Sequence, residues 1–200
     1  MSSTSSRRWG CLLPLAAVVL MFGGFALYLK LGSMYEESRP AAAAPPDLCA
    51  AIGAGLFERL VPDGTPEPRA IYSSGSDAAC QYYTAKSRPI GSDGYGFLGV
   101  RLLRYGQVGW DSGVDRAADA LVSSCANSAL AGQFHTASGL GDAACGVYND
   151  EGKDGTAHGS AVVRRGADLL WVDYYTHPGT ATQAQQAVTE ITLAALAGVH

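Results

Sequence analysis

The stretch GSAVVRRGADLLWVDYYT, residues 159–176, decides the fold of this chain. Its two apolar segments, 159–165 and 168–176, are separated by Gly166-Ala167, and a short break containing glycine between two such segments is typical of a β-hairpin. The second segment is apolar on both of its faces, as a strand at the centre of a sheet is. The sequence therefore predicts two long antiparallel strands, one of them central.

Strand and helix patterns continue on both sides of this hairpin. Residues 79–86, 97–105 and 144–150 have strand composition, and a short strand is expected near 70–73. Helices are predicted at 48–60 after the N-cap candidate Asp47, at 114–130, and at 180–199 with Thr180 or Thr182 as the cap. The strands lie too close together in the sequence for crossover helices. We therefore expect an α+β fold, an antiparallel sheet with helices packed on one face.

The N-terminal region has a different character. Residues 9–29 contain no charged side chain, and 21 helical residues span roughly 31 Å, the thickness of a bilayer core. We expect a cytoplasmic tail at 1–8, a transmembrane anchor at 9–29, a Pro- and Ala-rich linker at 30–46 and an extracytoplasmic domain at 47–199. Arg7 and Arg8 precede the apolar run, which places the N-terminus in the cytoplasm.

Two other interpretations of the apolar run fit the sequence less well. A cleaved signal peptide has a shorter apolar core followed closely by a small-residue site, whereas here the only such site, Ala41 to Ala44, lies more than ten residues beyond the run. A lipidated cysteine would have to follow the run, but Cys11 lies near its start. An uncleaved signal-anchor is therefore favoured, in a single-pass protein of the cell membrane.

Four cysteines follow the linker: Cys49, Cys80, Cys125 and Cys145. Four cysteines allow three pairings, and Cys49–Cys80 with Cys125–Cys145 is favoured because each pair closes a short loop. A zinc site is the alternative, but the chain has no C-x-x-C pair and no histidine at ligand spacing beside a cysteine. Disulfides form in oxidising compartments, so two disulfides place the domain outside the cytoplasm.

The residues offer little catalytic chemistry. His135, His158, His177 and His200 are scattered and form no metal motif. The run DEGKDG at 150–155 resembles a calcium loop but lacks two oxygen ligands, at Gly152 and Ala161, so a polar turn is expected. No G-x-S-x-G turn and no phosphate-binding loop occurs. We expect no cofactor and no metal.

Charge and aromatic content bear on partners. The part after residue 35 has eleven basic and eighteen acidic residues, a net charge of −7, which excludes a nucleic-acid footprint. Aromatic side chains are numerous enough to line a pocket, although core packing on a sheet is the simpler interpretation. They are Tyr82, Tyr83, Tyr95, Phe97, Tyr148, Trp171 and Tyr175.

Several features together resemble a known group of proteins. These are Asp47-Leu48-Cys49 opening a helix, Cys80-Gln81-Tyr82 about 30 residues later, SGLGDA at 138–143 ahead of a strand, and VVRRGADLLWV at 162–172. Across residues 47–199 the chain resembles an actinobacterial cell-envelope lipoprotein-like family of unknown function, similar to the extracellular sensor domain of PknH-type receptor kinases. The resemblance implies an α+β fold, two disulfides and ligand or partner binding without enzymatic activity. The chain differs in having no lipobox and no kinase domain.

These observations lead to three functional hypotheses. The first is a non-enzymatic, membrane-anchored binding or sensor-like module for an unknown envelope ligand or protein partner. The second is an envelope hydrolase whose Ser/His/Asp site is assembled in space from one of His135, His158 or His177. The third is a structural subunit of a membrane complex.

Overall fold

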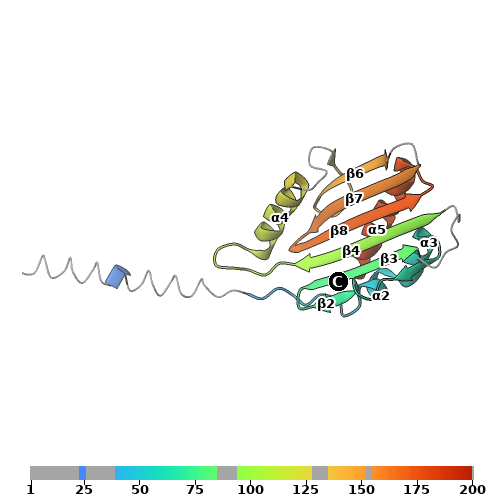
Figure 1. Cartoon of the computed structure of the whole chain (residues 1–200). Helices are drawn as coiled ribbons and strands as arrows, with labels where there is room; N and C mark the ends of the chain where they lie inside the picture. Colours follow the sequence, from blue (N-terminus) through green and yellow to red (C-terminus); the bar gives the residue numbers. More distant parts are fainter. Residues whose placement is uncertain (1–22, 26–38, 85–93, 128–134, 152–154, 200) are drawn as a thin grey trace, which may run out of the picture.

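The computed structural model of the chain describes residues 23–25, 39–84, 94–127, 135–151 and 155–199. Antiparallel strands form one sheet that is flanked by helices, so the α+β class and the antiparallel sheet are confirmed (Figure 1). The helices are α2 (Leu48–Ile52), α3 (Ala54–Leu60), α4 (Gly113–Asn127) and α5 (Ala181–Gly198). The strands are β1 (Gly64–Pro66), β2 (Tyr72–Ser74), β3 (Asp77–Thr84), β4 (Tyr95–Arg104), β5 (His135–Thr136), β6 (Ala143–Glu151), β7 (Thr156–Arg165) and β8 (Asp168–His177).

The predicted hairpin forms the middle of the sheet. The strand order is β1-β3-β4-β8-β7-β6-β5, with β2 also paired to β3. Strands β7 and β8 pair from Arg165 and Asp168 at the turn to Ala157 and Thr176. Strand β8 lies between β7 and β4, which confirms that it is a central strand. Strand β8 is apolar on both of its faces near its start because both are covered there, with Leu169 and Leu170 buried on opposite faces of the sheet.

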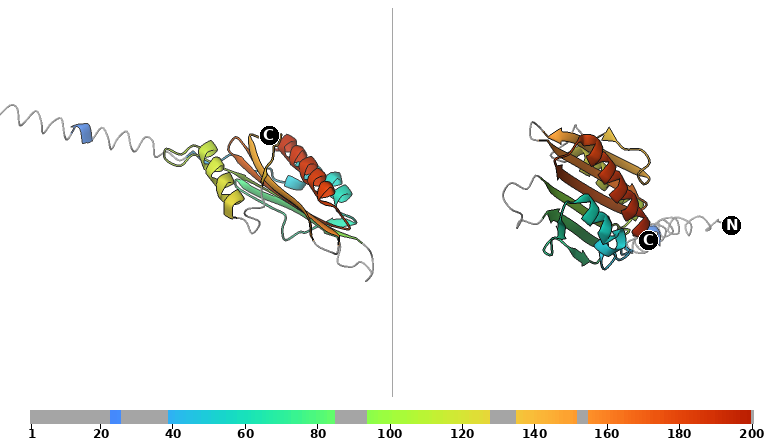
Figure 2. Two further views of the ribbon diagram at one scale, coloured as in Figure 1. Left: turned by 90° about the horizontal axis from the view of Figure 1, so that it is seen from above. Right: turned by 90° about the vertical axis from the view of Figure 1, so that its right-hand side faces the viewer.

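Helices cover both faces of the sheet, so the expectation of helices on one face was wrong. Helices α5 and α2 lie over one face, and α4 lies over the other (Figure 2). The α4 side chain of Leu121 packs with Cys145, Val162 and Leu169, whereas the side chains of the next residues, Val163 and Leu170, point into the main core beneath α5. Since side chains alternate along a strand, these two clusters lie on opposite faces.

The helix ends follow the predicted capping pattern. The Asp47 carboxylate accepts a hydrogen bond from the Ala50 backbone N–H at 2.9 Å. Thr180 and Gln183 form a capping box at the start of α5. One prediction was too simple: the expected helix at 48–60 divides at Gly53, whose φ of 106° ends α2 and begins α3. Only glycine adopts this backbone conformation at little cost.

The last residues of the predicted linker belong to the folded domain. Ala44 is buried in the main core, and its N–H donates to the Gly75 carbonyl at 2.8 Å. The Ala43 carbonyl accepts a hydrogen bond from Arg104 at 2.6 Å, and the Pro45 carbonyl accepts one from Ser73 at 2.9 Å. The folded domain therefore begins before Asp47.

The predicted anchor at 9–29 falls almost wholly outside the described residues, of which it contains only 23–25. Within the described ranges, no helix combines the length and the apolar character needed to cross a membrane. The cytoplasmic tail at 1–8 and the first part of the linker also lie outside the described residues.

Candidate functional site

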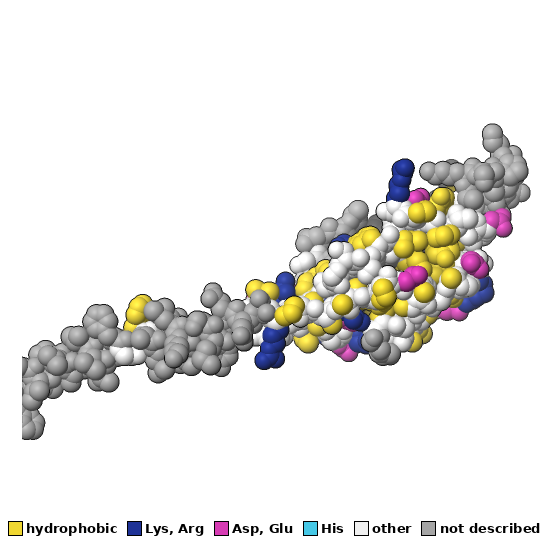
Figure 3. Space-filling model, turned by 90° about the horizontal axis from the view of Figure 1, so that it is seen from below, with side chains coloured by type: hydrophobic (Ala, Val, Ile, Leu, Met, Phe, Trp, Pro, Cys, Tyr) yellow, Lys and Arg dark blue, Asp and Glu magenta, His cyan; other side chains and the backbone are white. Residues whose placement is uncertain are grey.

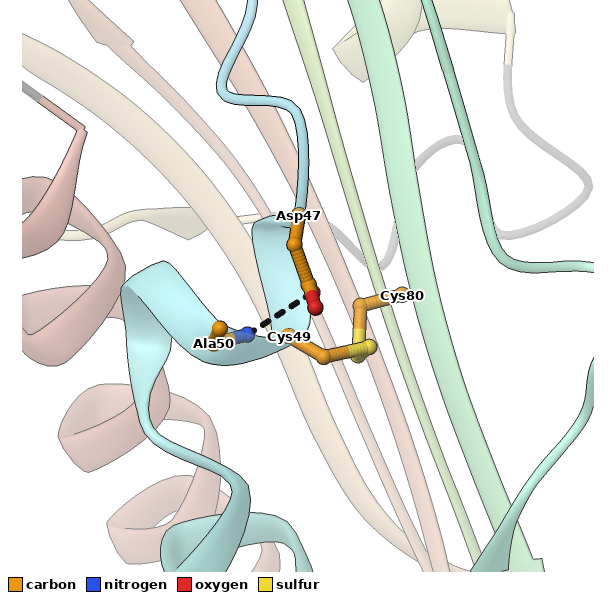
Figure 4. Close-up of a disulfide and its surroundings, with 4 residues drawn as sticks. All are labelled: Asp47, Cys49, Ala50 and Cys80. Carbon is orange, nitrogen blue, oxygen red and sulfur yellow. Dashed lines mark hydrogen bonds between the residues drawn. A yellow bond between two sulfur atoms is a disulfide. The ribbon is translucent and has the colours of Figure 1, made fainter.

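The four cysteines form the two predicted disulfides. Cys49 in α2 is bonded to Cys80 in β3, and the N-cap of Asp47 fixes the start of the same helix (Figure 4). Cys125 in α4 is bonded to Cys145 in β6. Each disulfide ties a helix to a strand, one on each face of the sheet. Their role is structural, because neither leaves a free thiol.

The described histidines lie in different surroundings. His135 is exposed on β5, His177 lies at the end of β8 with its ring stacked on Tyr95, and His158 is buried in β7 with its ring 4.2 Å from the ring of Tyr175. His200 lies outside the described residues. Among the described residues no group of three or more histidine, cysteine, aspartate or glutamate side chains is arranged to hold a metal ion.

Ser160 and Asp173 are the serine and carboxylate that the fold places together. They are paired residues on β7 and β8, and the serine hydroxyl donates to the carboxylate at 2.7 Å. His158 lies two residues before Ser160 on the same face but is only 2% exposed. A hydrolytic triad needs the serine to donate to a histidine that the carboxylate orients. Here the serine proton is directed at the carboxylate, which is not that arrangement.

Helix α4 leaves part of the sheet uncovered (Figure 1). A set of aromatic and polar side chains lines a hollow on that part of the sheet. Register places them in rows across the strands, because Ala79, Arg101 and Trp171 are paired along one row and Gln81, Gly99 and Asp173 along the next. We name this surface the open face. It consists of Tyr72, Ala79, Gln81, Phe97, Gly99, Arg101, Trp171 and Asp173.

Small residues at the centre of these rows make the open face concave. Ala79 and Gly99 lie between the larger side chains, and the surface encloses a hollow of about 350 Å³. The ring of Phe97 leans over Gly99, since a Cβ atom at that glycine would lie 3.0 Å from the ring. A glycine inside a strand is typical of a place where another group approaches the backbone closely.

Arg101 is held in place within the open face. Its guanidinium donates two hydrogen bonds to the Asp77 carboxylate, at 3.0 and 2.6 Å, and lies 5.4 Å from the centre of the Trp171 ring. Tyr72 donates a further hydrogen bond to Asp77 at 3.1 Å. Two of the five guanidinium donors are used by Asp77, so others are left for a ligand. The arrangement fixes a planar cation against an aromatic face.

These contacts shift the ionisation of the groups involved. The hydrogen bonds from Arg101 are the main cause that lowers the pKa of Asp77 below its ordinary value. Burial is the main cause that raises the pKa of Tyr72, and its hydrogen bond to Asp77 adds to this. The pKa of Arg101 is raised, chiefly by its hydrogen bonds to Asp77. At neutral pH the carboxylate is therefore charged and the phenol is neutral.

Two further hollows lie near β5 and β6. The larger, about 680 Å³, is lined by the C-terminal part of α4 and residues 135–145. Its one carboxylate, Asp142, accepts a hydrogen bond from the Gly166 N–H at 2.7 Å and faces Arg164. The other, about 340 Å³, lies between residues 135–140 and α5. Neither brings a cation, a carboxylate and large aromatic rings together, so the open face is the better candidate site although the first of these hollows has a larger volume.

The aromatic residues that the sequence singled out divide between the faces. Phe97, Trp171 and Tyr175 point toward the open face, whereas Tyr82 stacks on Phe57 in the main core. Arg101 and Asp77 are not among the residues that the sequence singled out. The alternation along 97–105, in which Phe97, Gly99 and Arg101 share one face, could have indicated Arg101. Asp77 lies on another strand and is linked to Arg101 only by the register of β3 and β4.

No protein-family model matches this chain, and comparison with curated proteins finds no match. The assignment of a function therefore depends on the site itself.

Proposed function

We propose that this chain is a membrane-anchored binding module whose open face binds a glycan of the cell envelope. In this proposal residues 9–29 anchor the chain, the N-terminus is cytoplasmic, and the domain lies outside the cell. The two disulfides support the extracytoplasmic location, because such bonds persist in oxidising compartments. The resemblance to extracellular sensor domains of PknH-type receptor kinases agrees with a binding role and stays a proposal.

The observation that carries the proposal is the juxtaposition of Trp171, Arg101 and Asp173 in one shallow hollow. Sugars present C–H groups on one side of the ring and hydroxyls at the edge. The negative face of an aromatic ring attracts the positively polarised C–H groups. The guanidinium supplies donors and the Asp173 carboxylate supplies an acceptor for the hydroxyls. Because the hollow is open to solvent, it can hold one segment of a glycan while the rest of the glycan extends beyond it.

The geometry supports binding over hydrolysis. Ser160 donates to Asp173, and the buried His158 is 2% exposed, so it offers a substrate little access. A general base must lie within hydrogen-bond reach of the proton that it removes from a reacting group. The hydrolase hypothesis and the structural-subunit hypothesis remain alternatives, and the second is tested by whether other proteins co-purify with the chain from detergent.

A glycan array tests the proposal. The full chain in mild detergent is applied beside Trp171→Ala and Arg101→Gln, with Leu193→Ala as a matched control, because Leu193 is a partly exposed apolar residue on α5. We expect glycans retained by the wild type and by Leu193→Ala to be lost with Trp171→Ala and weakened with Arg101→Gln. Retention of no glycan, or equal retention by all four proteins, would contradict the proposal.

A further inference from the structure

A tight turn between β4 and α4 presents a tryptophan to solvent. The backbones of Val108 and Asp111 exchange two hydrogen bonds, at 3.0 and 3.1 Å, around Gly109 and Trp110. The Gln107 side chain donates to the Gly109 carbonyl at 3.0 Å, and Gly109 has a φ of 58°. The turn is therefore held by three hydrogen bonds, and the fold keeps Trp110 at its tip.

Trp110 is the most exposed large hydrophobic side chain among the described residues, at 75%. Val108 in the same turn is 53% exposed, and Val114 at the start of α4 is also exposed. A tryptophan buries about 150–250 Å² when it is covered, whereas a standard protein interface needs roughly 800 Å² on each partner. This small apolar tip is therefore a poor match for a protein partner.

The turn lies at the end of the domain where the N-terminal segment joins it (Figure 1). Gly106 packs directly on the backbone of residues 39–41, so closely that a Cβ atom there would collide with the Arg39 carbonyl oxygen. Trp110 lies four positions after Gly106, a distance of at most about 14 Å. Hydrophobic and basic side chains gather at this end of the domain in Figure 3.

The chain outside the domain limits how far this end can move from the membrane. Arg39 lies ten positions after Leu29, the end of the predicted anchor, and this stretch spans at most about 36 Å. The turn is therefore within reach of the bilayer surface in which the anchor would sit. Tryptophan favours the headgroup level of membranes, because its ring is apolar and its N–H is polar.

We propose that the turn 108–111 inserts Trp110 and Val108 into the headgroup region of the membrane that holds the anchor. The inference depends on the anchoring part of the proposed function and not on the glycan. Acidic Asp111 and Asp115 and basic side chains lie at the same end of the domain, so the contact depends on apolar insertion and a zwitterionic lipid surface is sufficient for it. A second contact beside the anchor would fix the orientation of the open face relative to the bilayer.

Fluorescence quenching in vesicles tests this contact. Full-length Trp9→Phe and Trp9→Phe/Trp110→Phe chains are reconstituted into phosphatidylcholine vesicles, and the difference between their emission spectra reports Trp110. Lipids brominated near the headgroup are expected to reduce this difference emission about twofold. Aqueous acrylamide should quench it less in vesicles than in detergent. A matched control adds Leu193→Trp to the double variant, since a tryptophan on α5 should be quenched by acrylamide and not by brominated lipid.

The outcomes separate this inference from the proposed function. If the chain does not float with the vesicles, the anchor and the contact are both wrong. If it floats but Trp110 is quenched by acrylamide alone, the tip is in water and only the contact is overturned. If neither quencher reaches Trp110, a protein surface covers the tip, which also overturns the contact. Glycan retention by the Trp110→Phe chain is expected to stay unchanged.

Discussion

Arg101 binds Asp77 across two neighbouring strands in a diagonal pair. Asp77 pairs directly with Leu103, and Arg101 pairs with Ala79, so the two charged residues lie two positions apart on one face of the sheet. The small Ala79 side chain leaves the space through which the guanidinium reaches the carboxylate. The same guanidinium lies over Trp171, so one ion pair orients both the cation and the aromatic side of the open face.

Replacing Asp77 with Asn should change stability in a pH-dependent way. The hydrogen bonds from Arg101 lower the folded-state pKa of Asp77 below 3.8, so its contribution is present above about pH 4 and is lost as the pH falls through the folded-state pKa. The pair is 49% and 23% exposed, and solvent screening limits its contribution to about 0.2–1 kcal/mol. Urea unfolding at pH 7 should show this difference, and unfolding at a pH below the folded-state pKa of Asp77 should not. A constant difference at both pH values would contradict the assignment.

The two disulfides should contribute similarly to stability but differ in how easily a reductant reaches them. They close sequence separations of 31 and 20 residues, and loops of these lengths predict a loss of about 3 to 4 kcal/mol when either pair is replaced by alanine. Cys125 is partly exposed, whereas Cys49 and Cys80 are both buried. We therefore expect a reductant to open Cys125–Cys145 first under native conditions. Mass spectrometry after alkylation identifies the order, and earlier release of Cys49 and Cys80 would contradict it.

Gly159 allows α5 to lie close to β7. A Cβ atom there would lie 2.9 Å from the Val188 side chain and 3.1 Å from the Ala184 carbonyl oxygen, both in a packed helix. Gly159→Ala should therefore lower the free energy of unfolding by about 1–3 kcal/mol. Gly146→Ala is the matched control, because the atoms nearest to its new methyl group belong to the end of the Tyr148 side chain and not to a packed helix. Equal losses measured by thermal unfolding would show that the close helix approach is not the cause.

A fluorophosphonate probe should not label the native chain. Such probes react with serines whose proton is taken by a neighbouring histidine or lysine, whereas the proton of Ser160 is directed at the carboxylate of Asp173, a much weaker base. We expect the same low signal from the wild type and from Ser160→Ala, measured by in-gel fluorescence. Labelling that disappears in Ser160→Ala would instead support the envelope hydrolase.

Local signals in the sequence predicted most of the elements. The hairpin at 159–176, the Asp47 and Thr180 caps and the pairing of the four cysteines depend on residues close together in the chain, and all are confirmed. The division of the first helix was missed because the backbone freedom of Gly53 permits a break without requiring one.

The arrangement in space was harder to predict. The side of the sheet that α4 covers depends on which face Cys145 occupies, and ACGV at 144–147 shows no clear alternation of apolar and polar residues. The open face depends on the pairing of β4 with β8, which are separated by α4 and three strands in the sequence. The register must be known before Ala79 and Gly99 can be placed together at the centre of the hollow.

The emission of Trp171 during glycan titration tests the central claim most directly. In a full-length Trp9→Phe/Trp110→Phe chain, Trp171 is the sole tryptophan, and it lines the open face. A glycan identified on the array should change its emission saturably, and adding Arg101→Gln should raise the apparent Kd about tenfold, as expected for one lost charge-assisted hydrogen bond. A glycan that binds this chain without changing Trp171 emission, and equally well in the Arg101→Gln variant, would contradict the assignment of the open face as the binding surface.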